Sequence, residues 1–284
     1  MNILVTGSNG QLGSEFKELA KQYKDYQFFF TDKEELDVTI AEPLAKFCKE
    51  NKIDVLINCV GYTAVDQAEN DKPNATLLNA TAAKYMAEAT AKNGALMVHI
   101  STDYVFEGKN FRPYTENDTA SPKTVYGKSK LDGEIEVIFN AKRAIIFRTS
   151  WLYSSYGHNF VKIILDKAKK EKELKVVYDQ IGSPTYARDL AKTILDILPK
   201  IPVKIRSEIY NYSNEGVASW FDFAKAVTDY KGIKCKLFPV QSKDFPSVAT
   251  RPHYSILNKS RIKNEFGIEI PHWADSLKEC LEKL

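Results

Sequence analysis

The chain has 284 residues, of which 44% are hydrophobic and 27% charged, and its 40 basic and 37 acidic residues leave a net charge of +3. This composition excludes a largely disordered chain, because there is ample apolar material for a core. The charge balance gives no electrostatic argument for a nucleic-acid or membrane partner, and no run of about 18 apolar residues predicts a membrane span. The first residues lack the pattern of a signal peptide, so we expect a cytoplasmic protein. The cysteines suggest neither a disulfide framework nor a zinc site, because they are widely separated: Cys48, Cys59, Cys235 and Cys280.

Apolar segments alternate with helical patterns through the first 150 residues. Strands are predicted over residues 2–6, 27–31, 54–58, 96–101 and 144–148. Helices are predicted between them, over residues 11–23, 41–51, 73–93 and 124–140. This alternation predicts an α/β protein with a Rossmann-like, doubly wound parallel sheet that helices cover on both faces.

The second half of the chain is less regular. Helices are predicted over residues 159–171, 219–231 and 273–283, and strands over residues 174–178 and 208–212. Loops are indicated by four prolines, Pro239, Pro246, Pro252 and Pro271. We expect a dinucleotide-binding domain at residues 1–150 and a smaller C-terminal substrate-binding domain at residues 151–284, and residues of about 174–212 can return to the first sheet.

A glycine-rich segment, Gly7-Ser8-Asn9-Gly10-Gln11-Leu12-Gly13, lies between the first predicted strand and the first predicted helix. Gly7 permits a tight turn, Gly10 lets the backbone approach a pyrophosphate, and Gly13 lets the helix pack closely against the strand. Asp32 ends the second strand 19 residues after Gly13, where a carboxylate accepts hydrogen bonds from an adenosine ribose. The pattern therefore predicts a dinucleotide site, in which Asp32 favours NAD(H), whereas Lys33 could pair with a 2′-phosphate and admit NADP(H).

Tyr126 and Lys130 have the spacing Y-x-x-x-K within a predicted helix, so they share one helix face. A nearby ammonium group favours the phenolate and lowers the pKa of a tyrosine from its usual value of about 10. We therefore expect Tyr126 to act as a general acid or base, although an exposed pair on a helix surface has the same spacing. The fourth predicted strand runs into Thr102, whose hydroxyl could steady a developing oxyanion.

Longer motifs are spread over the whole chain. They are Gly10-Gln11-Leu12-Gly13, Thr63-Ala64-Val65-Asp66 with Ala68-Glu69, Ser101-Thr102-Asp103-Tyr104-Val105-Phe106, Val125-Tyr126-Gly127-Lys128, Arg148-Thr149-Ser150-Trp151-Leu152-Tyr153, Asp179-Gln180-Ile181-Gly182-Ser183-Pro184-Thr185 and Arg251-Pro252. With these motifs the sequence resembles the extended short-chain dehydrogenase/reductase superfamily, and within it the dTDP-4-dehydrorhamnose reductase family.

The resemblance implies that NADPH or NADH reduces the C4 ketone of dTDP-4-dehydro-β-L-rhamnose to dTDP-β-L-rhamnose, the last step of dTDP-L-rhamnose synthesis. It implies that Tyr126 protonates the new hydroxyl, that Lys130 lowers the pKa of Tyr126 and holds the nicotinamide ribose, and that Thr102 orients the carbonyl. Asp103 and Trp151 match sugar-contacting positions, and Arg251 could pair with the diphosphate. The positions that match the cofactor site are Asn9, Gly10, Gln11, Leu12, Asp32, Asp37, Val38, Gly61, Tyr62 and Thr63, beside Gly7, Gly13, Tyr126 and Lys130.

The resemblance also raises the question of a metal ion, because some relatives hold Mg²⁺ between two subunits through acidic residues. Glu15 and Asp189 match two such ligands, but Arg188 stands where a further carboxylate is expected. A cation at that position opposes metal binding. We therefore expect a monomer or homodimer, with Mg²⁺ not favoured.

Two other classes of function are compatible with the same fold: a nucleotide-sugar dehydratase or epimerase of the same superfamily, and a non-catalytic subunit. Nucleotide-sugar dehydratases of this superfamily have a Ser-Thr-Asp-Glu run after the fourth strand. Here Tyr104 takes the place of the glutamate, so elimination of water lacks its base. An epimerase retains its nicotinamide and consumes no reductant. A non-catalytic, dinucleotide-binding regulatory subunit is expected to lose catalytic or sugar-contacting residues, whereas this chain keeps Thr102, Tyr126, Lys130 and Trp151.

Overall fold

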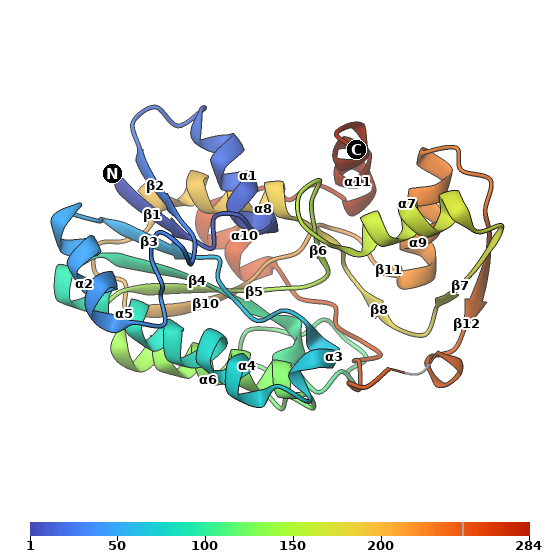
Figure 1. The fold of residues 1–284 in the computed structure, drawn as a ribbon, viewed down its shortest axis with the longest axis horizontal. Coiled ribbons are helices and arrows are strands. Elements are labelled where there is room, and N and C mark those ends of the chain that lie inside the picture. The colour runs from blue at the N-terminus through green and yellow to red at the C-terminus, as the bar shows by residue number, and fades with distance from the viewer. Residues whose placement is uncertain (246) are drawn as a thin grey trace.

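The computed structural model describes residues 1–245 and 247–284. Its central sheet has six parallel strands in the order β10-β5-β4-β3-β1-β2. The order reverses between β1 and β3, and such a reversal opens a crevice at the carboxyl ends of the strands. The fold class expected from the sequence is confirmed (Figure 1). The strands are β1 (Asn2–Thr6), β2 (Gln27–Thr31), β3 (Val55–Asn58), β4 (Leu96–Thr102), β5 (Ala144–Thr149) and β10 (Ser207–Asn211).

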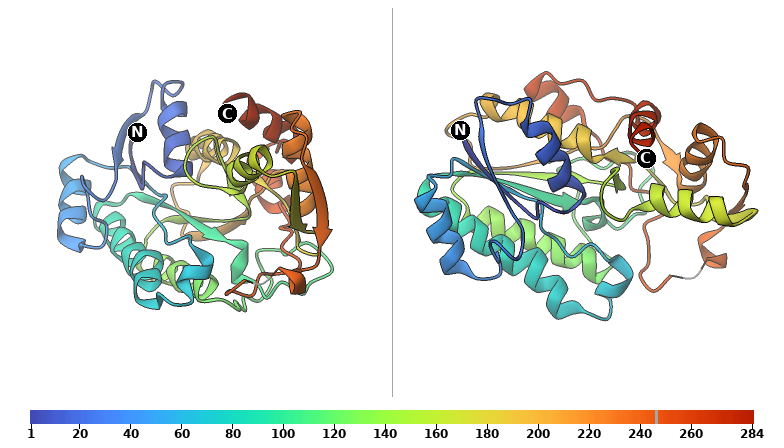
Figure 2. Two further views of the ribbon diagram at one scale, coloured as in Figure 1. Left: turned by 45° about the vertical axis from the view of Figure 1, so that its right-hand side comes forward. Right: turned by 45° about the horizontal axis from the view of Figure 1, so that its top comes forward.

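Helices cover both faces of the sheet because neighbouring side chains on a buried strand point in opposite directions. Ile3 and Val5 of β1 face one hydrophobic cluster, whereas Leu4 between them faces the other. One layer contains α1, α8 and α10, and the opposite layer contains α2, α5 and α6 (Figures 1 and 2). Their bounds are α1 (Gln11–Ala20), α8 (Ala187–Ile197), α10 (Ser260–Phe266), α2 (Ala41–Glu50), α5 (Ala82–Asn93) and α6 (Val125–Asn140).

The helix predicted over residues 73–93 is interrupted by one wider turn. Helix α4 (Lys72–Thr76) passes into a π-helical turn, Leu77–Thr81, before α5 begins. Gly133 of α6 touches this turn, since a Cβ atom there would come 2.1 Å from the carbonyl oxygen of Asn79. Such turns are frequent at functional sites, and this one presents Asn79 to the crevice.

The second half of the chain contributes to both parts of the molecule. Strand β10 pairs with β5 in the central sheet, whereas β7 (Glu173–Val177) pairs with β12 (Lys236–Val240) in a separate parallel pair. The remaining elements are α3 (Val65–Ala68), β6 (Leu152–Tyr153), α7 (Phe160–Lys170), β8 (Ile181–Gly182), β9 (Thr185–Tyr186), β11 (Ala218–Ser219), α9 (Trp220–Tyr230) and α11 (Trp273–Glu282), with single 3₁₀ turns at Asp103–Val105, Leu198–Lys200 and Ser242–Asp244.

Several expectations for the second half need correction. Pro239 lies within β12 rather than in a loop. Proline is tolerated there because both strands of a two-stranded sheet are edge strands, where its missing N–H group need not donate a hydrogen bond. Helices α8 and α10 were not predicted. Pro246 lies outside the described residues. Among the helices that the structure describes, none is long and apolar enough to cross a lipid bilayer.

Candidate active site

The glycine segment forms a tight turn between β1 and α1. Gly7 has φ +67°, and a Cβ atom there would come 2.9 Å from the carbonyl carbon of Cys59. A Cβ atom at Gly13 would come 2.4 Å from the carbonyl oxygen of Gly7. Side chains at these two positions would therefore collide with backbone, which leaves a cradle of bare main chain at the N-terminus of α1, the arrangement that suits a pyrophosphate.

A pocket of about 190 Å³ lies beside this cradle, and Gly7, Asp32, Leu36 and Val38 are among its lining residues. Asp32 accepts a hydrogen bond from the backbone nitrogen of Asn9 at 3.0 Å and so fixes the turn. Leu36 and Val38 are buried and give the pocket an apolar wall. The pocket also includes Lys33, Asp37, Thr39, Val60, Asn74, Leu77 and Leu78. An acidic rim on an apolar pocket beside the cradle fits the adenosine half of a dinucleotide.

The segment after β3 continues the crevice from the cradle towards α6. Asn79 accepts a hydrogen bond from the backbone nitrogen of Tyr62 at 2.8 Å and donates one to the Tyr62 carbonyl at 3.1 Å. It also donates to the hydroxyl of Ser129 on α6 at 2.9 Å. Gly61 lies between, and a Cβ atom there would come 3.8 Å from Nζ of Lys130. Sequence reasoning missed Asn79, because only the π-helical turn brings it here.

Thr102 and Tyr126 meet because α6 begins directly against the end of β4. Thr124 caps α6 by accepting a hydrogen bond from the backbone nitrogen of Gly127 at 3.0 Å. Gly127 permits the contact, since a Cβ atom there would come 2.3 Å from the carbonyl oxygen of Tyr104. The ring of Tyr126 consequently lies against that of Tyr104, with centroids 5.5 Å apart, and the Thr102 hydroxyl opposes the effect of burial on the Tyr126 pKa.

The pKa values of Tyr126 and Lys130 differ from the expectation in one respect. Burial raises the pKa of Tyr126 to about 12, despite the opposing hydrogen bond from Thr102. Lys130 instead donates to the carbonyl oxygen of Ile100 at 2.5 Å. The expected lowering of the Tyr126 pKa by Lys130 is therefore wrong for this arrangement. Burial lowers the pKa of Lys130 itself to about 8, and Tyr126 holds its proton at neutral pH.

Asp103 adds a buried carboxyl group next to Thr102. It is 3% exposed, and its Oδ1 atom accepts a hydrogen bond from the Thr102 hydroxyl at 3.0 Å. Oδ2 is buried with no hydrogen-bond partner among residues 1–245 and 247–284. Burial raises the pKa of Asp103 to about 6, against the opposing effects of the Ser255 and Thr102 hydroxyls. A buried oxygen in this condition is suited to a substrate hydroxyl. Sequence reasoning did not single out Ser255.

Trp151 lies between the two halves of the chain in an uncommon backbone conformation. It has φ +47°, a strained region for a bulky side chain, and such strain clusters at functional sites. Its ring stacks on Trp220 of α9, with centroids 3.6 Å apart and planes 7° apart. A Cβ atom at Gly182 would come 2.7 Å from Trp151, so glycine is required beneath the indole. Trp220, whose Nε1 donates to Gln180 at 3.1 Å, was missed because it lies 69 residues away in the sequence.

Arg251 is engaged by a partner that the sequence did not indicate. Its guanidinium donates two hydrogen bonds to Asp66, at 2.7 and 3.1 Å. The backbone nitrogen of Ala249 donates to the same carboxylate at 3.0 Å. This pair connects α3 with the segment before Pro252, and its hydrogen bonds hold the pKa of Asp66 below the usual range.

The acidic positions that resemble a magnesium site do not form one. Glu15 is fully buried and accepts a hydrogen bond from Ser154 at 2.6 Å, while Arg188 lies 3.5 Å from its other oxygen. Asp189 is turned towards Ser276 and Asn214, which donate to it at 2.5 and 2.6 Å. No group of three possible metal ligands occurs in the part of the chain that the structure describes. With a guanidinium in place of a carboxylate, these residues do not fit Mg²⁺.

The fold and this site are those of a nicotinamide-dependent oxidoreductase with a Rossmann-like sheet. The sequence profile of the RmlD substrate binding domain matches residues 1–284. The chain belongs to this family, which contains the dTDP-4-dehydrorhamnose reductases.

Individual relatives agree over their full lengths. A dTDP-4-dehydrorhamnose reductase of Aggregatibacter actinomycetemcomitans is 38% identical over 97% of this chain and 97% of its own. The crystal structure of a Clostridium acetobutylicum dTDP-4-dehydrorhamnose reductase has a TM-score of 0.95 and 39% identity, covering 99% of both chains. The Bacillus anthracis enzyme, solved in complex with NADP, has a TM-score of 0.95 and 36% identity, covering 100% of this chain and 99% of that one.

Proposed function

We propose that this chain reduces the C4 ketone of dTDP-4-dehydro-β-L-rhamnose to dTDP-β-L-rhamnose with NADPH or NADH, the last step of dTDP-L-rhamnose synthesis. The observation that carries the proposal is that Tyr126 and Lys130 of α6 pack against the end of β4, where Thr102 lies, at the crevice that starts at the glycine cradle. The family supports the same reaction, since several of its named relatives are dTDP-4-dehydrorhamnose reductases.

The protonation states favour the reductive direction. When bound, the reduced nicotinamide supplies the hydride that the ketone accepts. Tyr126, with a pKa of about 12, is protonated and can donate a proton to the new C4 oxygen. Thr102, whose hydroxyl donates to Asp103 in the structure, can orient the carbonyl once that hydroxyl turns to the substrate. Lys130, as an ammonium, adds positive charge beside the developing oxyanion.

We infer that the glycine cradle and the pocket beside it hold the cofactor. Asp32 can accept hydrogen bonds from the ribose of NADH, and the neighbouring Lys33 can pair with the 2′-phosphate of NADPH. Both lie on the rim of the 190 Å³ pocket, so the site accommodates either cofactor. The NADP-bound Bacillus anthracis relative supports use of the phosphorylated form.

We infer that Asp103, Trp151 and Arg251 contact the nucleotide sugar. The unpartnered oxygen of Asp103 suits a sugar hydroxyl. Trp151, whose ring is stacked on Trp220 and packed over Gly182, can meet a sugar only with the part of the indole that stays exposed. For Arg251, the two hydrogen bonds to Asp66 leave the remaining guanidinium N–H groups to meet a diphosphate. Tyr104 occupies the position of the second carboxylate in dehydratases, which favours net reduction over elimination.

The test is to incubate the purified protein and its Tyr126→Phe variant with an excess of NADPH and the 4-keto sugar. We expect the wild-type protein to oxidise one NADPH for each ketone reduced. We expect the variant to lose turnover by about 10²-fold or more, because the proton donor is missing, while its affinity for NADPH stays the same. Interconversion of sugars without loss of NADPH absorbance would indicate an epimerase, and unchanged turnover in the variant would refute the role of the phenol.

A further inference from the structure

A buried ion pair lies between α6 and β5, and the proposed reaction does not use it. Arg148 of β5 donates to both oxygens of Glu134 on α6, at 2.9 and 2.6 Å. The hydroxyl of Ser101 donates to the same carboxylate at 2.5 Å. Glu134, Arg148 and Ser101 are 1%, 4% and 3% exposed. The carboxylate therefore accepts three hydrogen bonds in a site from which water is excluded.

Each member of this group is close in sequence to a residue of the active site. Ser101 precedes Thr102, Glu134 lies one helical turn after Lys130, and Arg148 lies three residues before Trp151. The group therefore ties β4 and α6, the elements that bear the reacting side chains, to β5. Stability alone is a weak reason for burying such charges, because apolar side chains of similar volume commonly serve at least as well.

Glu134 lies one helical turn from Lys130 on the same face of α6, and the two side chains are 1% and 5% exposed. Glu134, on the same helix, and the Cys59 thiol, after β3, both raise the pKa of Lys130 against the effect of burial. His99 of β4 is buried near Lys130, and burial keeps its pKa low, so it is neutral. Arg148 lies beyond Glu134, with which it is paired. Of these four neighbours of Lys130, Glu134 is therefore the one that carries a full negative charge.

We propose that Glu134 is a positioning residue for the reaction: its carboxylate, held by Arg148 and Ser101 one helical turn from Lys130, holds the Lys130 amine at the Ile100 carbonyl. This inference rests on the proposed function, because it assigns Lys130 to the site of that reaction. Glu134 contacts neither of the proposed reacting groups, so it acts through Lys130. The alkaline limit of activity then reports the loss of the Lys130 proton.

The test is the pH dependence of turnover in Glu134→Gln, which keeps the side-chain shape and removes the charge. We expect the alkaline limb of the pH–kcat profile to move down by about one pH unit, because the charge that favours the ammonium is gone. The affinity of this variant for NADPH, measured by fluorescence titration without sugar, should begin to weaken at the same lower pH as its turnover does. An alkaline limb at the wild-type position overturns the inference.

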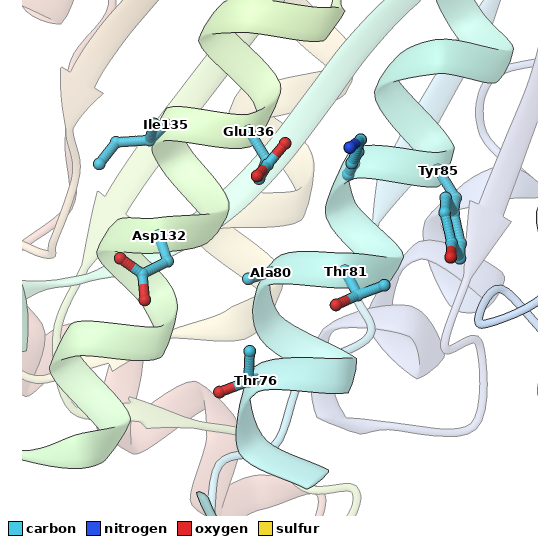
Figure 3. Close-up of a pocket in the computed structure, with 8 residues that line it drawn as sticks. Thr76, Ala80, Thr81, Tyr85, Asp132, Ile135 and Glu136 are labelled. Carbon is cyan, nitrogen blue, oxygen red and sulfur yellow. The ribbon is translucent and has the colours of Figure 1, made fainter. Parts of the chain in front are cut away.

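A matched control lies on the same helix. Glu136 is two residues further along and faces outward, into a surface pocket of about 390 Å³ between α6 and the segment that bears Thr76 and Tyr85 (Figure 3). Glu136→Gln removes the same charge at this site, away from Lys130. We expect its alkaline limb to coincide with that of the wild-type protein. An equal displacement in both variants would mean that the effect is general, which overturns a specific role for Glu134.

A second variant covers the case in which the Glu134→Gln change leaves Arg148 unpaired and the protein unstable. The double change Glu134→Leu with Arg148→Met removes both charges and keeps the volume, so we expect the fold to be retained in a thermal melt. Its alkaline limb should remain displaced downwards, whereas a return to the wild-type limb overturns the inference. The proposed function is judged separately, by NADPH consumption in the wild-type protein. Should that fail, the pH dependence of NADPH affinity still tests whether Glu134 controls Lys130.

Discussion

At the scale of single residues, the buried Asp103 carboxyl group lowers the stability of the fold and is available to bind the substrate. The carboxyl group is buried with one oxygen unpartnered among the described residues, and its pKa is raised to about 6. Below about pH 3 both folded and unfolded chains hold this proton. As the pH rises towards 6, the unfolded chain ionises first, so the folded state loses stability, by up to about 3 kcal/mol.

Asp103→Asn removes this ionisation and keeps a similar shape. We expect its free energy of unfolding to equal that of the wild-type protein below about pH 3 and to exceed it by about 1–3 kcal/mol at pH 7.5. We also expect a higher KM for the nucleotide sugar. Denaturant titrations at several pH values and steady-state kinetics measure the two effects. A variant less stable than the wild-type protein at pH 7.5 would contradict the argument.

At the scale of elements, the π-helical turn Leu77–Thr81 sets one wall of the crevice. Asn79 on this turn holds Tyr62, and Gly133 of α6 leaves room for it. A methyl group at Gly133 would come 2.1 Å from the Asn79 carbonyl oxygen, so the turn would have to move. Helix α6 therefore fixes both its own lysine and the loop that follows β3.

Gly133→Ala tests this packing. The change favours a helix by about 1 kcal/mol in isolation, but we expect the clash to outweigh this and to lower the free energy of unfolding by about 1–3 kcal/mol. NADPH affinity should fall as well, because Tyr62 loses its anchor. Denaturant unfolding and NADPH titration measure both effects, and Asp132→Ala, on the outward side of α6, is the control, with a change below about 0.5 kcal/mol. A variant as stable as the wild-type protein would show that the turn yields at no cost.

The elements that the sequence predicted are those with strong local patterns. The five strands of the first half, and the glycine turn with Asp32, are confirmed because apolar runs and glycine spacing are local properties. Helix α8 was missed although Leu190, Ile194 and Ile197 have helical spacing, because the strand patterns on either side favoured a return to the sheet over this region. The π-helical turn and the stacking of Trp151 on Trp220 depend on contacts between distant residues, which no local pattern encodes.

At the scale of the whole molecule, charged groups join the first half of the chain to the second. Glu15 of α1 meets Ser154 and Arg188, and Arg188 also lies 3.4 Å from Glu279 of α11. Burial raises the pKa of Glu15, while the cation and the hydroxyl oppose that shift. The guanidinium thus supplies the positive charge that a metal ion would otherwise bring.

Removal of divalent metal should therefore leave the protein unchanged. We expect EDTA and added Mg²⁺ to alter neither the molar mass in solution, whether monomer or homodimer, nor the melting temperature, nor turnover, because Arg188 already neutralises Glu15. Light scattering, calorimetry and the NADPH assay measure the three properties. A lower molar mass in EDTA, restored by Mg²⁺, would contradict the prediction.

The order of strands in the central sheet has a consequence for protein synthesis. Strand β5 ends at Thr149, but its outer neighbour β10 begins only at Ser207. A nascent chain with its first 150 residues outside the ribosome therefore displays an open sheet edge, which invites pairing with other chains. The edge closes once about 60 further residues have emerged, after roughly 3–12 s of translation.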